Sequence, residues 1–189
     1  MINRLVTLIF LILTGSSIKA HDFTLELKEL GNNMQRYTLI APDSTRVASL
    51  VVVPGSGLAV LGSPIFDTID KSKLPVETLH LICAIKAIKT RYELAEVAVM
   101  GDLYVHPEYR GKGHARNLLA KTCTQIFSQG FKAVVLTPDP FEYEDNKPKL
   151  LNDEVKKQQV IKLYQNCGFK KNNEDDPLFM YLDSMTHDL

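Results

Sequence analysis

The residues best suited to chemistry lie in one short stretch, residues 103–119, which reads LYVHPEYRGKGHARNLL. A run of β-branched and aromatic residues leads into a turn with Gly111 and Gly113, and a helical pattern begins immediately afterwards. Glycine lets a backbone turn tightly and approach a ligand without interference from a Cβ atom. The unpaired N–H groups of a first helical turn, with the positive end of the helix dipole behind them, favour an anion. The stretch therefore predicts a cradle for a phosphate or a pyrophosphate.

Cationic side chains add to this prediction. Four of them surround the turn: Arg110, Lys112, His114 and Arg116. The glycine spacing differs from the Walker pattern G-x-x-x-x-G-K-[ST] and from the dinucleotide pattern G-x-G-x-x-G, so neither of those phosphate sites is predicted. Two glycines alone leave a second interpretation open, in which this is a glycine-containing loop on a basic surface.

The turn resembles the acyl-CoA signature of the GNAT superfamily of N-acyltransferases. That signature is [RQ]-x-x-G-x-[GA], and residues 110–115 read RGKGHA. Residues 103–109 are similar to the strand and lead-in that precede the signature in the family. Further along, residues 163–169 (LYQNCGF) resemble the LYxxxGF element of the family, and residues 179–182 (FMYL) resemble its last strand. Two motifs separated by a helix, a strand and a second helix are far more specific than either motif alone.

The resemblance implies an acyl-CoA site that uses acetyl-CoA as a co-substrate and needs no metal. The backbone of the turn would hold the pyrophosphate of CoA, with contributions from Arg110, Gly111, Lys112, Gly113, His114 and Ala115. The main chain of the strand end, at Tyr104, Val105 and His106, would pair with the pantetheine arm. An N–H group left near the thioester carbonyl would stabilise the oxyanion that develops during attack.

The resemblance also implies a general acid and a general base. Tyr164 occupies the position where the family often has the acid that protonates the departing thiolate, although an apolar helix face also suits an ordinary core tyrosine. The acceptor amine must lose a proton before it attacks, and Asp102 is the best-placed carboxylate. In some relatives an acid occupies the position of Gly101, so Asp102 has the alternative interpretation of a simple strand carboxylate. Three substitutes for the base stay unranked: Glu96, His106 and Glu108.

The predicted function is transfer of an acetyl group from acetyl-CoA to a primary amine, by direct attack in a ternary complex. The acceptor is a small-molecule amine or an amine of a peptide or protein. The acids and aromatic residues of the loop 137–149 either recognise such a cation or simply form a solvated acidic loop, which is the more common case. The alternative is a non-catalytic, exported GNAT-like module that retains CoA binding. A balance of 22 basic and 22 acidic residues argues against a nucleic-acid partner.

The first twenty residues predict a secretory signal peptide. Arg4 precedes an apolar run from Leu5 to Leu13, which at ~1.5 Å per residue covers less than half of the ~30 Å hydrocarbon core of a membrane. Cleavage after Ala20 would leave one N-acetyltransferase-like domain, residues 21–189, with no stable membrane insertion. The protein would then be exported, either periplasmic or secreted. The alternatives are a translation start at Met34 and a cytoplasmic enzyme.

Export would permit disulfides, but the three cysteines give no reason to assign a pair. They are Cys83, Cys123 and Cys167, and the last two fall on helix faces predicted to be buried. No C-x-x-C pair or Cys/His cluster indicates a metal site.

Periodicity predicts the elements that must position the turn. Strands are predicted at residues 23–27, 36–41, 46–53, 58–61, 97–105, 133–137 and 178–182. Residues 79–88 fit a strand or a helix, and we take the strand; residues 137–149 are predicted to be a loop. Helices are predicted at residues 113–129 and from a cap at Asn152–Asp153 to Asn166.

This order predicts an α/β or α+β domain. The resemblance implies a GNAT-like form of it: a mixed, mostly antiparallel central sheet with helices on both faces. Its parallel strand pair would splay apart at the acyl-CoA site.

Overall fold

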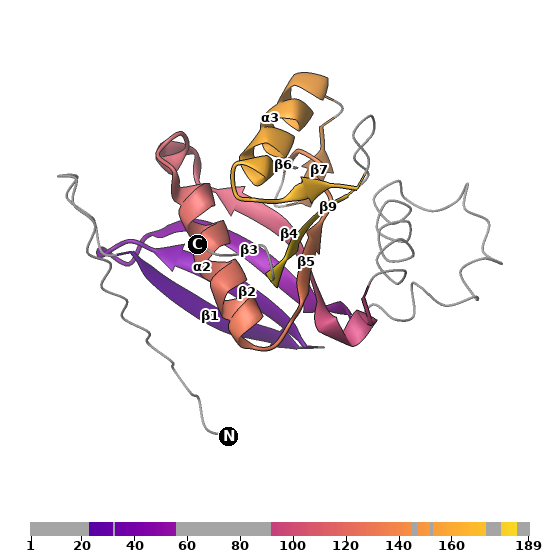
Figure 1. Ribbon diagram of the computed structural model, residues 1–189. Helices are drawn as coiled ribbons and strands as arrows, with labels where there is room; N and C mark the ends of the chain where they lie inside the picture. The colour runs from indigo at the N-terminus through magenta and orange to yellow at the C-terminus, as the bar shows by residue number, and fades with distance from the viewer. Residues whose placement is uncertain are drawn as a thin grey trace, which may run out of the picture.

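A seven-stranded sheet organises the part of the chain that the computed structural model describes, which is residues 23–31, 33–55, 92–144, 147–151, 153–172 and 179–184. The strands lie side by side in the order β1-β2-β3-β4-β5-β9-β8 (Figure 1). Their bounds are Thr24–Gly31, Met34–Ile40, Arg46–Pro54, Val97–Val105, Ala133–Leu136, Met180–Asp183 and Lys170–Lys171, in that order.

Two α-helices and a separate hairpin complete the described fold. The helices are α2, His114–Ser128, and α3, Glu154–Gln165; the hairpin pairs β6, Phe141–Glu144, with β7, Lys147–Leu150. Short 3-10 turns, η4 at Leu94–Glu96 and η5 at Pro107–Tyr109, flank the two ends of β4. All pairings in the main sheet are antiparallel except that of β4 with β5. The predicted mixed, mostly antiparallel α/β architecture with one parallel pair is therefore confirmed.

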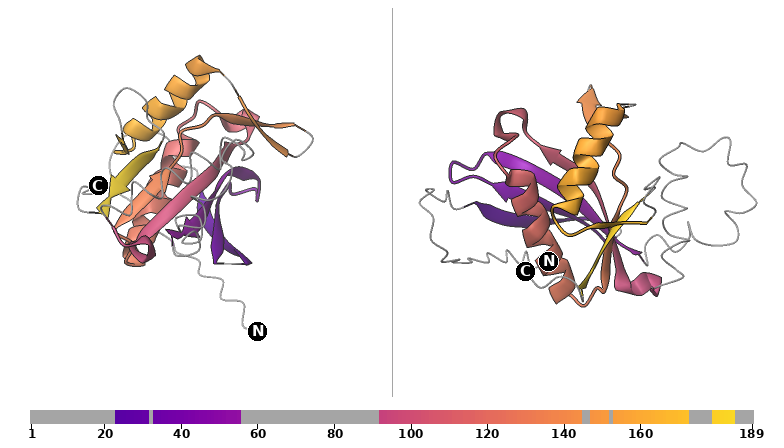
Figure 2. Two further views of the ribbon diagram at one scale, coloured as in Figure 1. Left: turned by 90° about the vertical axis from the view of Figure 1, so that its right-hand side faces the viewer. Right: turned by 45° about the horizontal axis from the view of Figure 1, so that its top comes forward.

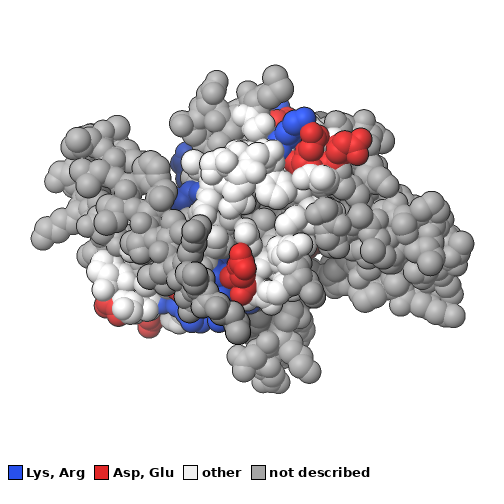
Figure 3. Space-filling view, turned by 90° about the horizontal axis from the view of Figure 1, so that it is seen from below, with Lys and Arg blue, Asp and Glu red and all other residues white. Residues whose placement is uncertain are grey.

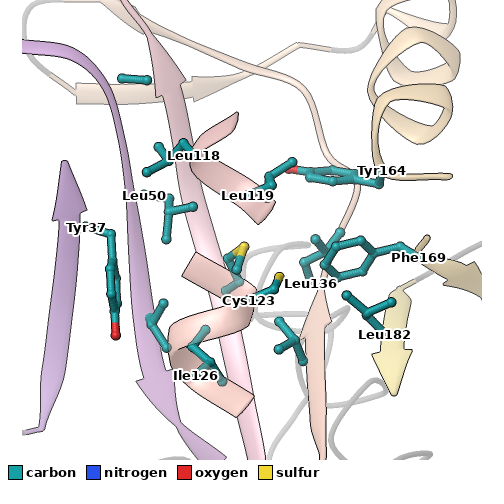
Figure 4. Close-up of a cluster of buried hydrophobic side chains, with 14 of the residues drawn as sticks. Tyr37, Leu50, Leu118, Leu119, Cys123, Ile126, Leu136, Tyr164, Phe169 and Leu182 are labelled. Carbon is teal, nitrogen blue, oxygen red and sulfur yellow. The ribbon is translucent and has the colours of Figure 1, made fainter. Parts of the chain in front are cut away.

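Both described α-helices, α2 and α3, cover the same face of the sheet. The resemblance implied helices on both faces, and no α-helix on the second face is among the described residues. The buried residues of α2 recur at the spacing of a half-buried helix: Leu118, Leu119, Thr122, Cys123 and Ile126. They pack in one cluster with fully buried Tyr37 and Leu50 of the sheet and with Ile161 and Tyr164 of α3 (Figures 2 and 4). Burial of this apolar surface is the main source of stability for the domain.

Helix boundaries follow the predicted local chemistry. The carboxylate of Asp153 accepts a hydrogen bond of 3.0 Å from the Lys156 N–H, so it caps α3 as predicted. Gly130 has a φ of 94° directly after α2, and Gly168 has a φ of 88° after α3. Both conformations are left-handed, which is where glycine ends helices at little cost.

β4 changes its alternation halfway along. Its early residues Ala98 and Met100 point into the helix-covered core, whereas its later residues Leu103 and Val105 pack against that same core. A β-bulge causes this change of the residues that face the core. Val51 pairs with Gly101 and Ser49 with Tyr104, so two residues of β4 lie opposite Leu50 of β3. A regular strand would have directed Asp102 into the core.

β4 and β5 part at this bulge. Their parallel pairing runs from Val97 opposite Ala133 to Met100 opposite Leu136 and ends there. β4 continues to Val105, still paired with β3 on its other side. The last five residues of β4 thus extend beyond the pairing with β5, at the position where the splay is predicted. We call this region beside β4 the splay.

One predicted loop is wrong. Residues 137–149 contain the β6–β7 hairpin instead. Its antiparallel register sets Phe141 opposite Leu150 and Glu144 opposite Lys147. Pro138, Pro140 and the polar stretch that follows them favoured a loop, but both prolines precede the first strand of the hairpin.

Several predictions fall outside the described residues. They are the signal peptide (residues 1–20), the strands at 58–61 and 79–88, and Cys83.

Among the helices of the described ranges, none has both the length and the apolarity needed to cross a membrane. In the view from below, the acidic and basic side chains of the described residues lie in small groups of mixed sign (Figure 3).

Candidate active site at the splayed strands

The glycine turn is open. Gly111 has a φ of 73° and Gly113 a φ of 81°, so both adopt the left-handed conformation that other residues avoid. A Cβ atom built on either glycine would meet nothing within 4 Å, and both residues are exposed. Among the described residues, therefore, no side chain occupies the space next to these two glycines.

The start of α2 leaves its first N–H groups uncapped. The first bond of the helix runs from the Asn117 N–H to the Gly113 carbonyl at 3.0 Å. The N–H groups of His114, Ala115 and Arg116 precede it, and no side chain of the N-cap residue Gly113 accepts from them. A 15-residue helix places the positive end of its dipole at this point. These groups suit an anion such as a pyrophosphate.

Arg110 connects the turn to the end of β4. Its Nε donates a hydrogen bond of 3.1 Å to the carbonyl oxygen of Val105. That carbonyl points away from β3, because Val105 alternates with His106, whose N–H bonds the Val47 carbonyl of β3 at 2.9 Å. The guanidinium is thus held on the side of β4 that β5 has left.

The three strand-end residues differ in what their main chains can still bind. Both backbone groups of His106 are occupied, since its carbonyl accepts from the Tyr109 N–H at 2.9 Å. Tyr104 shares the orientation of His106 toward β3, where it pairs with Ser49. Val105 is the one of the three whose N–H faces the splay.

Aromatic rings pack against one another next to the glycine turn. The His114 ring lies 4.7 Å from the Phe23 ring and 5.8 Å from the Tyr109 ring, and Tyr109 lies 6.0 Å from His106. The Lys112 ammonium sits 5.5 Å from the centre of the Tyr109 ring. Burial, and secondarily the charge of Lys112, lowers the pKa of His114. His114 is therefore a neutral ring at neutral pH rather than the cation that the sequence analysis counted.

Phe23 is a contact that sequence reasoning missed. It lies at the start of β1, far from the turn along the chain, and its carbonyl accepts a hydrogen bond of 3.1 Å from the Lys121 ammonium. No local pattern links these residues, because only the folded sheet brings the start of β1 beside α2.

Tyr164 lies in the core, in the same buried cluster as Met100 and Leu136, where the pairing of β4 with β5 ends. Its side chain is 7 % exposed, its ring packs 5.7 Å from the Phe169 ring, and its hydroxyl points toward Leu119 of α2 (Figure 4). Burial raises the pKa of Tyr164 above its ordinary value, and the nearby Cys167 and Asp139 raise it further. The hydroxyl thus stays protonated at neutral pH.

Three carboxylates lie near the splay or the glycine turn, and a fourth lies at the opposite end of β4. Asp102 is exposed at the bulge with a φ of 52°, and half-buried Asp139 follows the end of β5. Glu108 is exposed in η5, next to the turn. Glu96 precedes the opposite end of β4 and forms an ion pair of 2.5 Å with Lys132, which removes it from the site.

The two described cysteines, Cys123 and Cys167, are free. Burial, with a smaller effect from Cys167, raises the pKa of Cys123 to about 12, so its thiol is inert at neutral pH. Within the described ranges, no group of three or more His, Cys, Asp or Glu side chains comes together as a set of metal ligands.

Comparison with known proteins gives one family match. Residues 80–171 match the model of the acetyltransferase (GNAT) domain. A comparison of the sequence with curated proteins finds no match.

Similar solved structures share little sequence with this chain. A mutant spermidine/spermine N-acetyltransferase from Vibrio cholerae is 14% identical, with 82% of this chain and 70% of that chain covered and a TM-score of 0.45. The Vibrio cholerae spermidine N-acetyltransferase in complex with CoA and spermine is 14% identical, with 83% and 69% covered and a TM-score of 0.46. A GNAT-family acetyltransferase from Staphylococcus aureus is 13% identical, with 82% and 70% covered and a TM-score of 0.44.

The matched stretch carries the splayed strands, the glycine turn with α2, and the Tyr164 helix. Residues 80–171 therefore match the acetyltransferase (GNAT) domain, the domain of acyl-CoA N-acyltransferases.

Proposed function

We propose that this domain transfers an acetyl group from acetyl-CoA to a primary amine by direct attack in a ternary complex. The observation that carries the proposal is the end of β4–β5 pairing at Met100 and Leu136, beside a glycine turn and an uncapped helix start. An extended thioester arm needs unpaired strand backbone, and its diphosphate needs N–H donors. Both are present within one strand and the turn that follows it.

The turn holds the diphosphate. Backbone N–H groups at the start of α2 donate to it, and the open space at Gly111 and Gly113 admits it. Arg110, fixed by its bond to Val105, and exposed Lys112 add positive charge at the rim. His114 contributes its backbone N–H and a neutral ring that packs behind the turn.

Val105 positions the reacting group. When bound, acetyl-CoA supplies an activated acyl group whose carbon–sulfur bond breaks as the amine nitrogen bonds to the carbonyl carbon. The Val105 N–H faces the splay and is placed to donate to the carbonyl oxygen, where negative charge grows during attack. His106 takes no part through its main chain, since both of its backbone groups are occupied.

Tyr164 gives a proton to the departing thiolate. A phenol with a raised pKa is a weak acid. Burial also raises the pKa of a thiol, however, so a thiolate in the same surroundings becomes a stronger base. The nearby Cys123 shows the size of this effect, since burial raises the pKa of its thiol to about 12. A thiolate expelled into the same surroundings is therefore basic enough to take the Tyr164 proton.

Asp102 takes the proton that the attacking amine loses, directly or through water. Its position at the bulge places an exposed carboxylate beside the last paired residues of β4 and β5. Asp139, across the splay at the end of β5, attracts the cationic acceptor before it is deprotonated. The proton balance then closes over two losses from the nitrogen. The ammonium loses one proton before attack, which passes through Asp102 to solvent, and a second as the amide forms, which replaces the proton that Tyr164 gives to the thiol.

The test compares two glycine variants. Gly113→Ala places a Cβ in the cradle, and Gly130→Ala places one at the far end of α2, where the φ of 94° imposes a similar strain and the space is equally open. Both should lose about 1–2 kcal/mol of stability. Only Gly113→Ala should weaken acetyl-CoA binding in calorimetry, by about tenfold or more.

Thiol release with a panel of amines then separates the two functional readings. Turnover of any amine supports the enzyme, whereas binding without turnover supports the non-catalytic module. Equal binding by both glycine variants would contradict the placement of the cradle.

We also infer that residues 1–20 are a signal peptide and that the protein is exported. The support is the short apolar run after Arg4 and the small residues before His21. Intact mass and amino-terminal sequencing of the protein from its own host should find His21 first. A chain that begins at Met1 or Met34 would contradict export by this route.

A further inference from the structure

We propose that β1 is a self-complementary interface strand, through which two copies of this protein pair antiparallel and join their sheets into one. β1 is the outermost strand in the sheet order, and it pairs with β2 on one side (Figures 1 and 2). Within the described residues no strand pairs with its other side. An eight-residue edge strand presents a row of N–H and C=O groups that a second strand can bind.

An apolar side chain is exposed on this edge. Leu27 is 38% exposed, and it lies opposite Tyr37 of β2, which is fully buried. The apolar surface of the core therefore extends to Leu27 at the edge of the sheet, where this side chain is partly exposed. A partner strand laid along β1 would cover it.

The charges beside Leu27 select one register. In an antiparallel pair centred on Leu27, that leucine faces its own copy, Glu26 faces Lys28 of the second copy, and Lys28 faces Glu26 of the second copy. Two opposite-charge pairs form and no like charges face each other. Opposite charges at facing positions stabilise a strand pair, and like charges destabilise it.

Neighbouring registers lack this match. Sliding the pair by two residues in one direction sets Glu26 opposite Glu26, and sliding it in the other sets Lys28 opposite Lys28. Charged residues on an edge strand often serve only to discourage pairing. Here the order Glu-Leu-Lys matches itself in an antiparallel pair, because each acid then faces a base of the second copy. The same charges therefore favour a second copy of this strand.

The pairing has two-fold symmetry and leaves the acyl-CoA site open. β2 and β3 separate β1 from β4 in the sheet, so the splay lies away from the interface. A two-fold axis perpendicular to the sheet keeps the α2 helices of both copies on the same face. The proposal concerns assembly and does not depend on whether the domain is catalytic.

Charge-swap variants test the interface by the mass of the purified protein in light scattering across a dilution series. The unchanged protein should show twice the mass of one chain. Glu26→Lys and Lys28→Glu each replace both favourable pairs with like charges, and each should weaken dimerisation by about tenfold or more. An equimolar mixture of the two variants restores both opposite-charge pairs and should regain the dimer, as should the double variant.

Glu29→Lys is the matched control. It makes the same charge change on the same strand, but Glu29 faces Leu25 in the proposed register, so this variant should dimerise like the unchanged protein. Melting curves establish that each variant is folded. A monomer at all concentrations, a dimer that survives both single swaps, or a mixture that fails to regain the dimer would each overturn the proposal.

Discussion

At the scale of the residue, Tyr164 combines a structural and a chemical role. Its ring packs with Phe169 in the core, and its hydroxyl extends from that core toward α2. Tyr164→Phe keeps the ring and removes the proton, so kcat should fall about 100-fold while acetyl-CoA affinity stays unchanged. A melting curve close to that of the unchanged protein, together with slow thiol release, is the expected pair of results. Full activity in Tyr164→Phe would exclude it as the acid.

The pH dependence of the Tyr164 step follows from the direction of its pKa shift. Burial raises the pKa above the ordinary 10.0, so the phenol keeps its proton throughout the neutral and mildly alkaline range. The rate should therefore show no loss from Tyr164 as pH rises toward about 10. Rates of thiol release between pH 7 and 10, corrected for free amine, check this. A fall in this range that disappears in Tyr164→Phe would contradict it.

Thr122 is a buried residue whose hydroxyl has no hydrogen-bond partner among the described residues. Its side chain is fully buried in the apolar stripe of α2. Thr122→Val replaces the hydroxyl with a methyl group of similar size, so it should raise the free energy of unfolding by about 1 kcal/mol. Thr122→Ser keeps the hydroxyl and removes a methyl group, and it should lower stability by about 1 kcal/mol. Denaturant unfolding of both variants measures the two changes, and a destabilised Thr122→Val would indicate a hidden partner.

At the scale of the element, the capped start of α3 can be tested alone. The Asp153 carboxylate accepts from the Lys156 N–H, and its loss leaves that donor unsatisfied. Asp153→Ala should cost about 1 kcal/mol, and Asp153→Ser should recover most of it. Denaturant unfolding measures both. Equal stability of the alanine variant would show that water replaces the cap without cost.

Sequence patterns predicted elements whose own residues specify them. The two helices and the Asp153 cap follow from local signals, and the structure confirms them. The β6–β7 hairpin was missed because neighbouring prolines outweighed a weak alternation of acids and aromatics. The packing of Phe23 on His114 and the occupied main chain of His106 depend on residues distant in sequence, so no local pattern could reveal them.

At the scale of the whole molecule, binding of the co-substrate should stabilise the fold. Acetyl-CoA at about 100 times its Kd adds about 2.7 kcal/mol to the native state. For a chain of 189 residues that corresponds to a rise in Tm of roughly 5–10 °C. At the same acetyl-CoA concentration the rise should fall to about half or less in Gly113→Ala and stay unchanged in Gly130→Ala. A Tm that does not move at millimolar acetyl-CoA would argue against the cradle itself.

The bulge in β4 has a consequence for the length of the chain. It lets Met100 and Leu103 share one face, and so it turns Asp102 outward. Deleting Asp102 would remove the extra residue and move Arg110 closer to the splay by one strand step of ~3.3 Å. Asp102→Gly, in contrast, alters chemistry but not spacing. Between the bulge and the glycine turn, a substitution should therefore disturb the fold less than a deletion of one residue.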